Sequence, residues 1–202
     1  MNGIAYRSDR VQPGDAFFCV VGMTTDGHSF AQDAIDRGAK VLVVERKVYL
    51  ADATDVTEIV VKDTRKAMAA AAANFYDHPS KDLALVGITG TNGKTTTTYL
   101  VKHMLEDAGH KVGLIGTNQN LIGDEVIETE RTTPESYELH ALFARMRDAG
   151  CTHVIMEVSS HSLVLDRVHG IPFAVGAFTN LTQDHLDFHK TMEEYRKAKA
   201  AA

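Results

Sequence analysis

Short apolar runs separated by turn residues mark the first part of the chain. Each is rich in β-branched or aromatic residues, which predicts strands. The predicted strands are FFCVV (17–21), KVLVVE (40–45) and EIVV (58–61). Between the first two, the segment 29–38 has the apolar spacing of a helix, with Ser29 and Gln32 as a predicted capping box. An alanine-rich helix is expected from Thr64 to about Tyr76.

From residue 83 onward, strand and helix patterns alternate. The predicted strands are LALVGI (83–88), KVGLIG (111–116), HVIMEV (153–158) and FAVGAFTN (173–180). A helix is expected from Lys94 to Ala108, and a second one with Thr133 as N-cap and Pro134 as its first residue. The apolar residues of the second helix recur at i, i+3, i+4 and i+7, at Leu139, Leu142, Phe143 and Met146.

This alternation predicts an α/β fold whose parallel sheet has helices on both faces and collects ligands at the carboxyl ends of its strands. The polar, proline-bearing segment DHPSKD (77–82) favours a break between two domains. We expect a small N-terminal α/β domain over 1–80 and part of a P-loop parallel-sheet domain over 81–202.

The composition narrows the classes of partner. The chain has 202 residues, of which 44% are hydrophobic and 24% charged, as in globular proteins. Its net charge of -6 offers no basic surface, so we expect no nucleic acid partner and small phosphorylated ligands instead. Cys19 and Cys151 lie in or beside apolar runs without CxxC spacing and are predicted to be buried, reduced thiols. No apolar run approaches the roughly 18 residues of a membrane span, which favours a cytoplasmic protein without membrane insertion.

The segment GITGTNGKTTTTYL (87–100) lies between a predicted buried strand and a predicted helix. A glycine-rich turn there points backbone N–H groups into one concavity in front of the helix dipole, which favours an anion. In the P-loop pattern, Lys94 reaches the β and γ phosphates of a nucleotide and Thr95 reaches Mg²⁺. The usual earlier glycine is replaced by Ile88, so the loop is a variant. The predicted nucleotide-binding residues are Gly90, Thr91, Asn92, Gly93, Lys94, Thr95 and Thr96.

Two further residues are candidates for metal binding. Glu157 ends an otherwise apolar strand, where an unpaired buried carboxylate would be costly, and it is either a magnesium ligand or a structural acid that caps the next turn. The i, i+4 spacing of His185 and His189 by itself suggests a zinc site. A zinc protease would have glutamate directly after the first histidine, and this chain has Leu186 there, which argues against that pattern.

Four stretches, in order and spacing, resemble the Mur ligases. They are GITGTNGKTTT (87–97), RTTPE (131–135), MEVSSHSLVLDRV (156–168) and FTNLTQDHLDFH (178–189). Two N-terminal stretches, SDRVQPGDAFFCVVG and TDGHSFAQDAIDRGA, resemble that family's uridine-binding domain. The resemblance implies an ATP-dependent amide ligase of peptidoglycan synthesis that activates a carboxylate as an acyl phosphate.

Within the family, the resemblance favours the branch that adds the third residue of the stem peptide to UDP-N-acetylmuramoyl-L-alanyl-D-glutamate. Whether that residue is lysine or meso-diaminopimelate stays open. The alternatives are a MurF or folylpolyglutamate synthetase-like ligase, and a free-standing P-loop module that switches on nucleotide binding. Family members continue into a further domain, so we expect this chain alone to be a monomer that binds nucleotides weakly and turns over nothing.

The resemblance also assigns site residues. The implied catalytic residues are Lys94, Glu157, His185 and Lys199, and the implied metal ligands are Thr95, Glu157, His185 and Lys199. In the family a lysine that matches Lys199 is carbamylated, but Lys199 stands three residues from the end, where we expect fraying and no modification. Many relatives have Asp-Ser-Arg where this chain has Arg7, Ser8 and Asp9. This exchange of charges either preserves an ion pair or abolishes a contact. The implied substrate-binding residues are Ser8, His28, Thr132, Thr133, Ser159 and Arg167.

Overall fold

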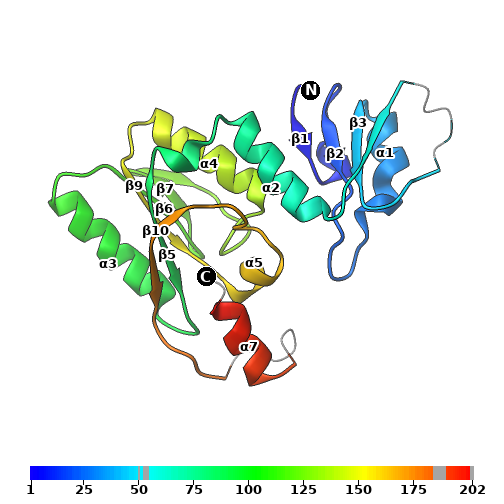
Figure 1. Ribbon diagram of the computed structural model, residues 1–202. Coiled ribbons are helices and arrows are strands. Elements are labelled where there is room, and N and C mark those ends of the chain that lie inside the picture. The colour runs from blue at the N-terminus through cyan, green and yellow to red at the C-terminus, as the bar shows by residue number, and fades with distance from the viewer. Residues whose placement is uncertain (50, 52–54, 184–189, 201–202) are drawn as a thin grey trace. The chain divides into compact units, whose positions relative to one another are not determined.

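The computed structural model describes residues 1–49, 51, 55–183 and 190–200 (Figure 1). These residues form two compact units, Met1–Ala71 and Ala72–Ala202, and the division falls within α2 (Thr64–Phe75). The domain ranges 1–80 and 81–202 stay a prediction. Among the described residues, no helix has the length and apolar character needed to cross a membrane.

The first unit contains a parallel sheet with the strand order β1-β2-β3-β4. Its strands are β1 (Ile4–Ala5), β2 (Ala16–Phe18), β3 (Val41–Val44) and β4 (Thr57–Val60). Phe17, Cys19 and Leu42 lie in its hydrophobic core. Cys19 is a fully buried free thiol, as predicted, and this burial raises its pKa to about 12.

Helical turns connect these strands, and the predicted capping box is wrong. The segment begins as η2 (Gly27–Phe30) and continues as α1 (Ala31–Asp36), whose N-cap Phe30 has no side-chain cap. The carboxylate of Asp26 starts η2 instead, by accepting a hydrogen bond from the N–H of His28. The shorter η1 (Ser8–Arg10) follows β1.

The second unit contains a six-stranded sheet with the order β10-β5-β9-β6-β7-β8. Its strands are β5 (Ala84–Thr89), β6 (Val112–Ile115), β7 (Asn120–Ile122), β8 (Glu125–Ile127), β9 (His153–Glu157) and β10 (Phe173–Phe178). As predicted, the first four strands in that order are parallel. The hairpin of β7 and β8 is antiparallel and was not predicted, although Gly123 and Asp124 between two apolar pairs are a hairpin signal.

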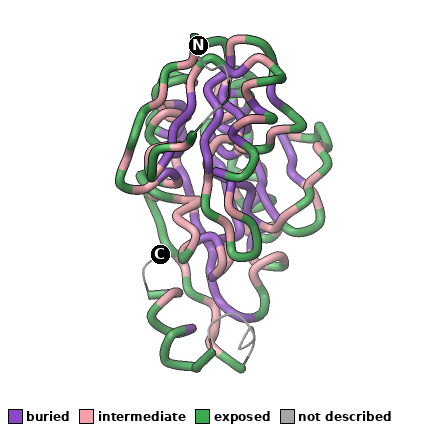
Figure 2. The backbone as a smooth tube through the Cα atoms, turned by 90° about the vertical axis from the view of Figure 1, so that its right-hand side faces the viewer, coloured by how far each residue is buried: buried purple, intermediate pink, exposed green. Residues whose placement is uncertain are grey.

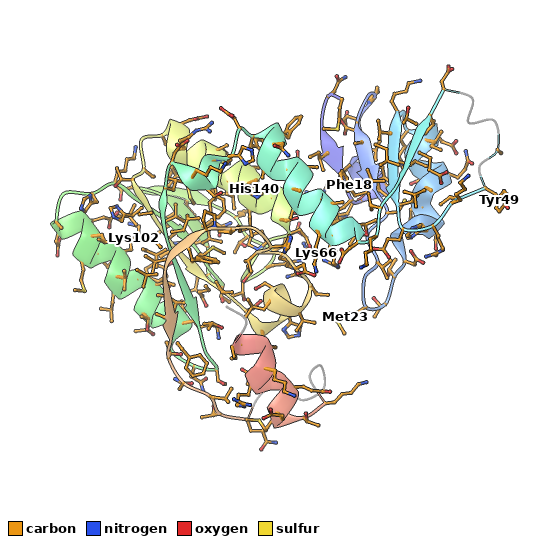
Figure 3. The ribbon with its side chains drawn as sticks, viewed as in Figure 1. Phe18, Met23, Tyr49, Lys66, Lys102 and His140 are labelled. Atoms are coloured by element: carbon orange, nitrogen blue, oxygen red, sulfur yellow. The ribbon has the colours of Figure 1, made fainter. Side chains whose placement is uncertain are left out.

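Two long helices cover opposite faces of this sheet (Figures 1 and 3). Val101 and Leu105 of α3 (Lys94–Asp107) pack against Ile88 and Ile155, on one face. On the other face, α4 (Ser136–Asp148) buries the four apolar residues of the predicted periodicity, which is confirmed: Leu139, Leu142, Phe143 and Met146. Figure 2 colours the backbone by burial, with the buried residues in purple.

The predicted start of α4 is wrong. The N-cap is Glu135, and the N3 residue Glu138 completes a capping box with it. The Thr133 hydroxyl instead donates to the main-chain oxygen of Glu157 at 2.8 Å. A contact across the sheet thus replaces the local cap.

Strand register brings the candidate residues to one edge of the sheet. Ile88 of β5 pairs with Glu157 of β9, and Thr89 pairs with Phe178 of β10. Ile115 of β6 pairs with Met156, so β6 ends at the same level. The carboxyl ends of four parallel strands therefore meet where such sheets hold ligands.

Candidate nucleotide and magnesium site

The glycine-rich loop joins β5 to α3. Gly90 has φ +141° and Gly93 has φ +83°, conformations that favour glycine. A Cβ on Gly90 would lie 1.9 Å from Oγ1 of Thr179. Ile88 is fully buried within β5, so the strand core occupies the place of the usual first glycine and the loop begins at Gly90.

The end of β10 holds this loop in place. The main-chain N–H groups of Thr91 and Asn92 donate to the main-chain oxygen and to Oδ1 of Asn180, at 2.9 and 3.0 Å. The Asn92 carbonyl accepts from Oγ1 of Thr179 at 2.7 Å. These two amides are therefore engaged within the protein.

The N–H groups open to a phosphate lie one turn further on. Gly93 is the N-cap of α3 and carries no side-chain cap. The N–H groups of Gly93, Thr95 and Thr96 have no acceptor among the described residues. Three amides at the N-terminus of a fourteen-residue helix form an anion site.

Two ammonium groups converge on the loop. Nζ of Lys94 donates to the carbonyls of Gly90 and Thr91 at 2.9 and 2.8 Å. Nζ of Lys199 donates to the same Gly90 oxygen at 2.7 Å. Positive charge therefore stands beside the open amides.

The expectation that Lys199 frays is wrong. It ends α7 (Met192–Lys199), is only 3% exposed and lies 4.8 Å above the ring of Tyr195. The Tyr195 side chain is fully buried, and its hydroxyl contacts Oγ1 of Thr91 at 3.1 Å. Contacts with the phosphate loop anchor this helix at both residues.

Glu157 ends β9 with its side chain buried, at 1% exposure. Oγ1 of Thr95 lies 3.0 Å from both carboxylate oxygens, and the N–H and hydroxyl of Thr117 donate at 2.9 and 3.1 Å. Within the described part of the chain, no cationic side chain pairs with this carboxylate. A buried carboxylate with only neutral donors is costly unless a cation joins it.

Thr95 and Glu157 therefore fit a divalent ion. The described residues contain no cluster of three or more His, Cys, Asp or Glu side chains suited to a metal. Magnesium takes most of its oxygen ligands from water and phosphate and needs only one or two protein groups. His185, which the resemblance implies as a metal ligand, lies outside the described residues, as does His189.

These groups line one cavity of about 640 Å³. Its walls bring together eleven of the predicted site residues, namely Thr91, Asn92, Gly93, Lys94, Thr95, Thr132, Thr133, Glu157, Ser159, Arg167 and Lys199. Gly90 and Thr96 flank the lining, and Ser8 and His28 belong to the first unit. Thr117 also lines the cavity, and the sequence analysis did not single it out.

The wall opposite the phosphate loop carries the TTP and SSH stretches. Thr133 is 1% exposed, and its hydroxyl accepts from the N–H of Ser159 at 3.1 Å while it donates to Glu157. Arg167 donates to the Thr133 carbonyl at 3.0 Å and pairs with Glu135 at 2.9 Å. Thr133 therefore supports this wall from inside, and the substrate contacts expected of Thr133, Ser159 and Arg167 stay a prediction.

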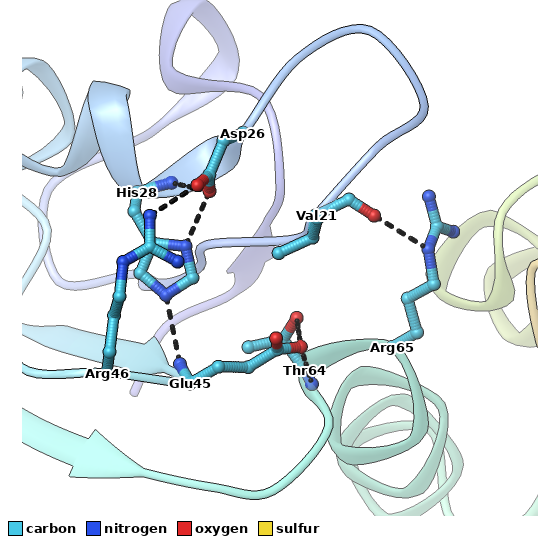
Figure 4. Close-up of polar contacts among 7 residues, drawn as sticks. All are labelled: Val21, Asp26, His28, Glu45, Arg46, Thr64 and Arg65. Atoms are coloured by element: carbon cyan, nitrogen blue, oxygen red, sulfur yellow. Dashed lines mark hydrogen bonds and ion pairs between the residues drawn. The ribbon is translucent and has the colours of Figure 1, made fainter.

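In the first unit, His28 belongs to a polar network (Figure 4). Its Nδ1 lies 2.6 Å from Asp26, and its Nε2 accepts from the N–H of Glu45 at 3.0 Å. Oε1 of Glu45 accepts from the N–H and hydroxyl of Thr64, at the start of α2. Both ring nitrogens thus have partners inside the unit, which supports a structural role, and substrate binding by His28 stays a prediction.

Arg46 completes this network. Its guanidinium pairs with Asp26 and, with the His28 groups, holds the pKa of that carboxyl well below its usual range. In the same unit, Arg7 pairs with Asp9 at 2.8 Å, and whether the exchanged charges alter a substrate contact stays open. Ser8 between them hydrogen bonds Asp33 and lowers the pKa of its carboxyl.

A glycine-rich loop that opens a helix beside a parallel sheet, with a lysine and a buried carboxylate at its mouth, defines a P-loop protein of the α/β class. The sequence profile of the Mur ligase middle domain matches residues 88–201. The profile described as Mur ligase family, catalytic domain, matches residues 1–76. The chain belongs to the Mur ligase family.

Individual relatives agree with this assignment. The chain is 54% identical over 199 residues to a UDP-N-acetylmuramoyl-L-alanyl-D-glutamate–2,6-diaminopimelate ligase of Clostridium perfringens, covering 98% of this chain and 41% of that protein. A ligase of the same description from Clostridium acetobutylicum is 55% identical over 202 residues, with the same shares covered. This chain thus spans about two fifths of these relatives.

Solved structures share the fold. A UDP-N-acetylmuramoyl-L-alanyl-D-glutamate–2,6-diaminopimelate ligase matches with a TM-score of 0.81 and 26% identity, covering all of this chain and 40% of that one. MurF from Acinetobacter baumannii matches with a TM-score of 0.64 at 20% identity, covering 98% of this chain and 40% of that one. The second likeness concerns the fold alone.

Proposed function

We propose that the chain is the N-terminal part of an ATP-dependent amide ligase of the MurE type. The reaction joins an amino acid to UDP-N-acetylmuramoyl-L-alanyl-D-glutamate, through an acyl phosphate, in peptidoglycan precursor synthesis. The observation that carries this proposal is the buried Glu157 carboxylate, held beside the Thr95 hydroxyl and the open amides of α3 without a cationic partner in the described chain. Such an arrangement needs a divalent ion and suits phosphoryl transfer.

Different groups of the chain would contribute to the activation of the substrate carboxylate. The amides of Gly93, Thr95 and Thr96 and the ammonium of Lys94 bind the terminal phosphates of ATP and offset the charge that develops on the transferred group. Thr95 and Glu157 would hold Mg²⁺, which would supply Lewis acidity to that transfer. Because the relatives' descriptions specify 2,6-diaminopimelate, we propose the same amino acid here.

Lys199 supports the finer proposal of a carbamylated lysine. Its buried ammonium shares the Gly90 carbonyl with the ammonium of Lys94. Two like charges on one oxygen repel each other, whereas a carbamate would attract Lys94 and offer oxygen to a second magnesium ion, with His185. NMR after equilibration with ¹³C-bicarbonate should show a carbamate signal that the Lys199→Arg variant lacks. The same signal in both would refute the assignment.

The open wall of the cavity, with Thr132, Ser159 and Arg167, is proposed for the muramyl nucleotide and its peptide. Uridine binding by Ser8, in the first unit, is a separate proposal. Hydroxyl groups and an arginine suit phosphate and carboxylate oxygens. We further propose that the protein is a cytoplasmic monomer and that this chain alone turns over nothing. No specific observation favours the MurF-type ligase or the free-standing nucleotide switch.

The test is calorimetric titration of the chain. UDP-N-acetylmuramoyl-L-alanyl-D-glutamate should bind weakly and plain UTP should not, and a non-hydrolysable ATP analogue should bind only with Mg²⁺. Lys94→Ala should lose binding of the ATP analogue and keep binding of the muramyl nucleotide. Lys197→Ala, on the exposed side of α7, is its matched control. Equal binding of UTP, or magnesium-independent binding of the ATP analogue, would contradict the proposal.

A further inference from the structure

The turn after β6 hydrogen bonds both oxygens of the Glu157 carboxylate. The Thr117 N–H donates to Oε1 at 2.9 Å, and the Thr117 hydroxyl donates to Oε2 at 3.1 Å. The preceding residue, Gly116, must be small, since a Cβ there would lie 2.5 Å from Oε1. The N–H of Gly116 donates to Oδ1 of the buried Asn120, which holds the turn. This turn therefore fixes both the position and the rotation of the carboxylate.

The same hydroxyl extends the contact toward the opposite wall. Oγ1 of Thr117 lies 3.0 Å from Oγ1 of Thr132. A hydroxyl has one hydrogen, and the carboxylate can only accept, so Thr117 gives its hydrogen to Glu157 and Thr132 donates to Thr117. The three side chains form a directed chain of hydrogen bonds across the cavity.

We infer that Thr117 is a positioning residue for the metal ligand Glu157 and that, through Thr132, it links the magnesium end of the cavity to the muramyl-nucleotide end. This inference rests on the proposed function. A carboxylate already oriented by outer hydrogen bonds loses less freedom when it binds a metal, and loss of such a partner typically weakens metal binding by about 10 to 100-fold. When a ligand oxygen accepts the Thr132 hydrogen, the Thr117 hydroxyl loses its hydrogen-bond donor. Ligand binding at the muramyl-nucleotide end therefore changes the hydrogen bonding of the Glu157 carboxylate at the magnesium end.

The test measures the Mg²⁺ concentration for half-maximal binding of a non-hydrolysable ATP analogue to the full chain. Thr117→Val keeps the N–H and the size but removes the hydroxyl, and it should raise that concentration on the order of tenfold. Thr117→Ser should restore it. The matched control is Thr152→Val, because that hydroxyl contacts Nδ1 of His153 at the opposite end of β9, at 2.8 Å. Circular dichroism melts establish that each variant is folded.

A double-variant cycle tests the link. Thr132→Val alone should raise the half-maximal Mg²⁺ concentration less than Thr117→Val does, and it should add nothing in the Thr117→Val background. Additive effects would overturn the link through Thr132.

The remaining outcomes separate the inference from the proposed function. If Thr117→Val binds Mg²⁺ like the parent while Glu157→Gln does not, the positioning role is overturned and the magnesium site stands. If Thr117→Ser is as weak as Thr117→Val, the hydroxyl is not the cause and the inference also falls. If the parent itself shows no magnesium-dependent binding, both are overturned.

Discussion

Replacing Glu157 by glutamine removes a charge from the interior while keeping the shape of the side chain. The carboxylate is buried, and its hydrogen-bond partners among the described residues, the hydroxyls of Thr95 and Thr117 and the Thr117 N–H, are all neutral. Neutral hydrogen bonds offset only part of the several kcal/mol that desolvation of a carboxylate costs. Without a bound cation, this charge therefore destabilises the folded chain.

Glutamine can make the same contacts. Its oxygen can accept from the Thr117 N–H, and its amide nitrogen can donate to the hydroxyls of Thr95 and Thr117, which also accept. We expect Glu157→Gln to raise the free energy of unfolding of the ligand-free chain by about 1 to 2 kcal/mol. Magnesium-dependent binding of an ATP analogue should be lost, because a neutral amide attracts Mg²⁺ far less than a carboxylate does.

The assay is urea unfolding followed by circular dichroism, with and without Mg²⁺ and a non-hydrolysable ATP analogue. The ligands should raise the free energy of unfolding of the parent by an amount set by their concentration and affinity. They should leave the free energy of unfolding of the variant unchanged. Glu125→Gln is the matched control, since its exposed pair with Arg145 should contribute under about 1 kcal/mol. A ligand-free Glu157→Gln chain that is less stable by about 1 kcal/mol or more would refute the reasoning, because the charge would then be favourably paired.

Three further predictions concern the loop and the core. Gly90→Ala forces a Cβ to 1.9 Å from Oγ1 of Thr179 at φ +141°, so it should cost roughly 1–3 kcal/mol in urea unfolding and weaken nucleotide binding in calorimetry. Phe143→Ala empties a fully buried position on the sheet-facing side of α4 and should cost about 3–5 kcal/mol in the same unfolding assay. Burial, with His78 nearby, lowers the pKa of His140 from 6.5 to about 4, so stability should fall by up to about 3 kcal/mol as pH drops through that window. His140→Leu should reduce this pH dependence by the His140 contribution, and an unchanged slope would show that other groups cause it.

Local sequence signals were sufficient for the parallel sheet and for the two helices that cover it. The 3.6-residue periodicity of α4 depends only on which face is buried, and all four predicted positions are buried. The phosphate loop was equally visible, because it needs glycines and a lysine at adjacent positions. Glu157 was found because a charged residue at the end of an apolar strand is costly unless it has a function.

Contacts between distant segments could not be predicted in this way. Thr133 has the composition and spacing of an N-cap, yet its hydroxyl bonds to Glu157, 24 residues further along the chain. Lys199 looked like a frayed end because its anchor, the Gly90 carbonyl, is 109 residues away. Thr117 could have been found by asking which polar residues follow the other parallel strands, the rule that singled out Glu157.

The central claim is that Thr95 and Glu157 hold a divalent ion against phosphates bound at the start of α3. A crystal structure of the chain with Mn²⁺ in place of Mg²⁺ and a non-hydrolysable ATP analogue tests it most directly, because anomalous scattering locates the metal. The account predicts an anomalous peak within coordination distance of the Thr95 hydroxyl and a Glu157 oxygen, with phosphates on the amides of Gly93, Thr95 and Thr96. A nucleotide bound with its metal elsewhere, and the Glu157 carboxylate still bonded only to Thr95 and Thr117, would contradict it.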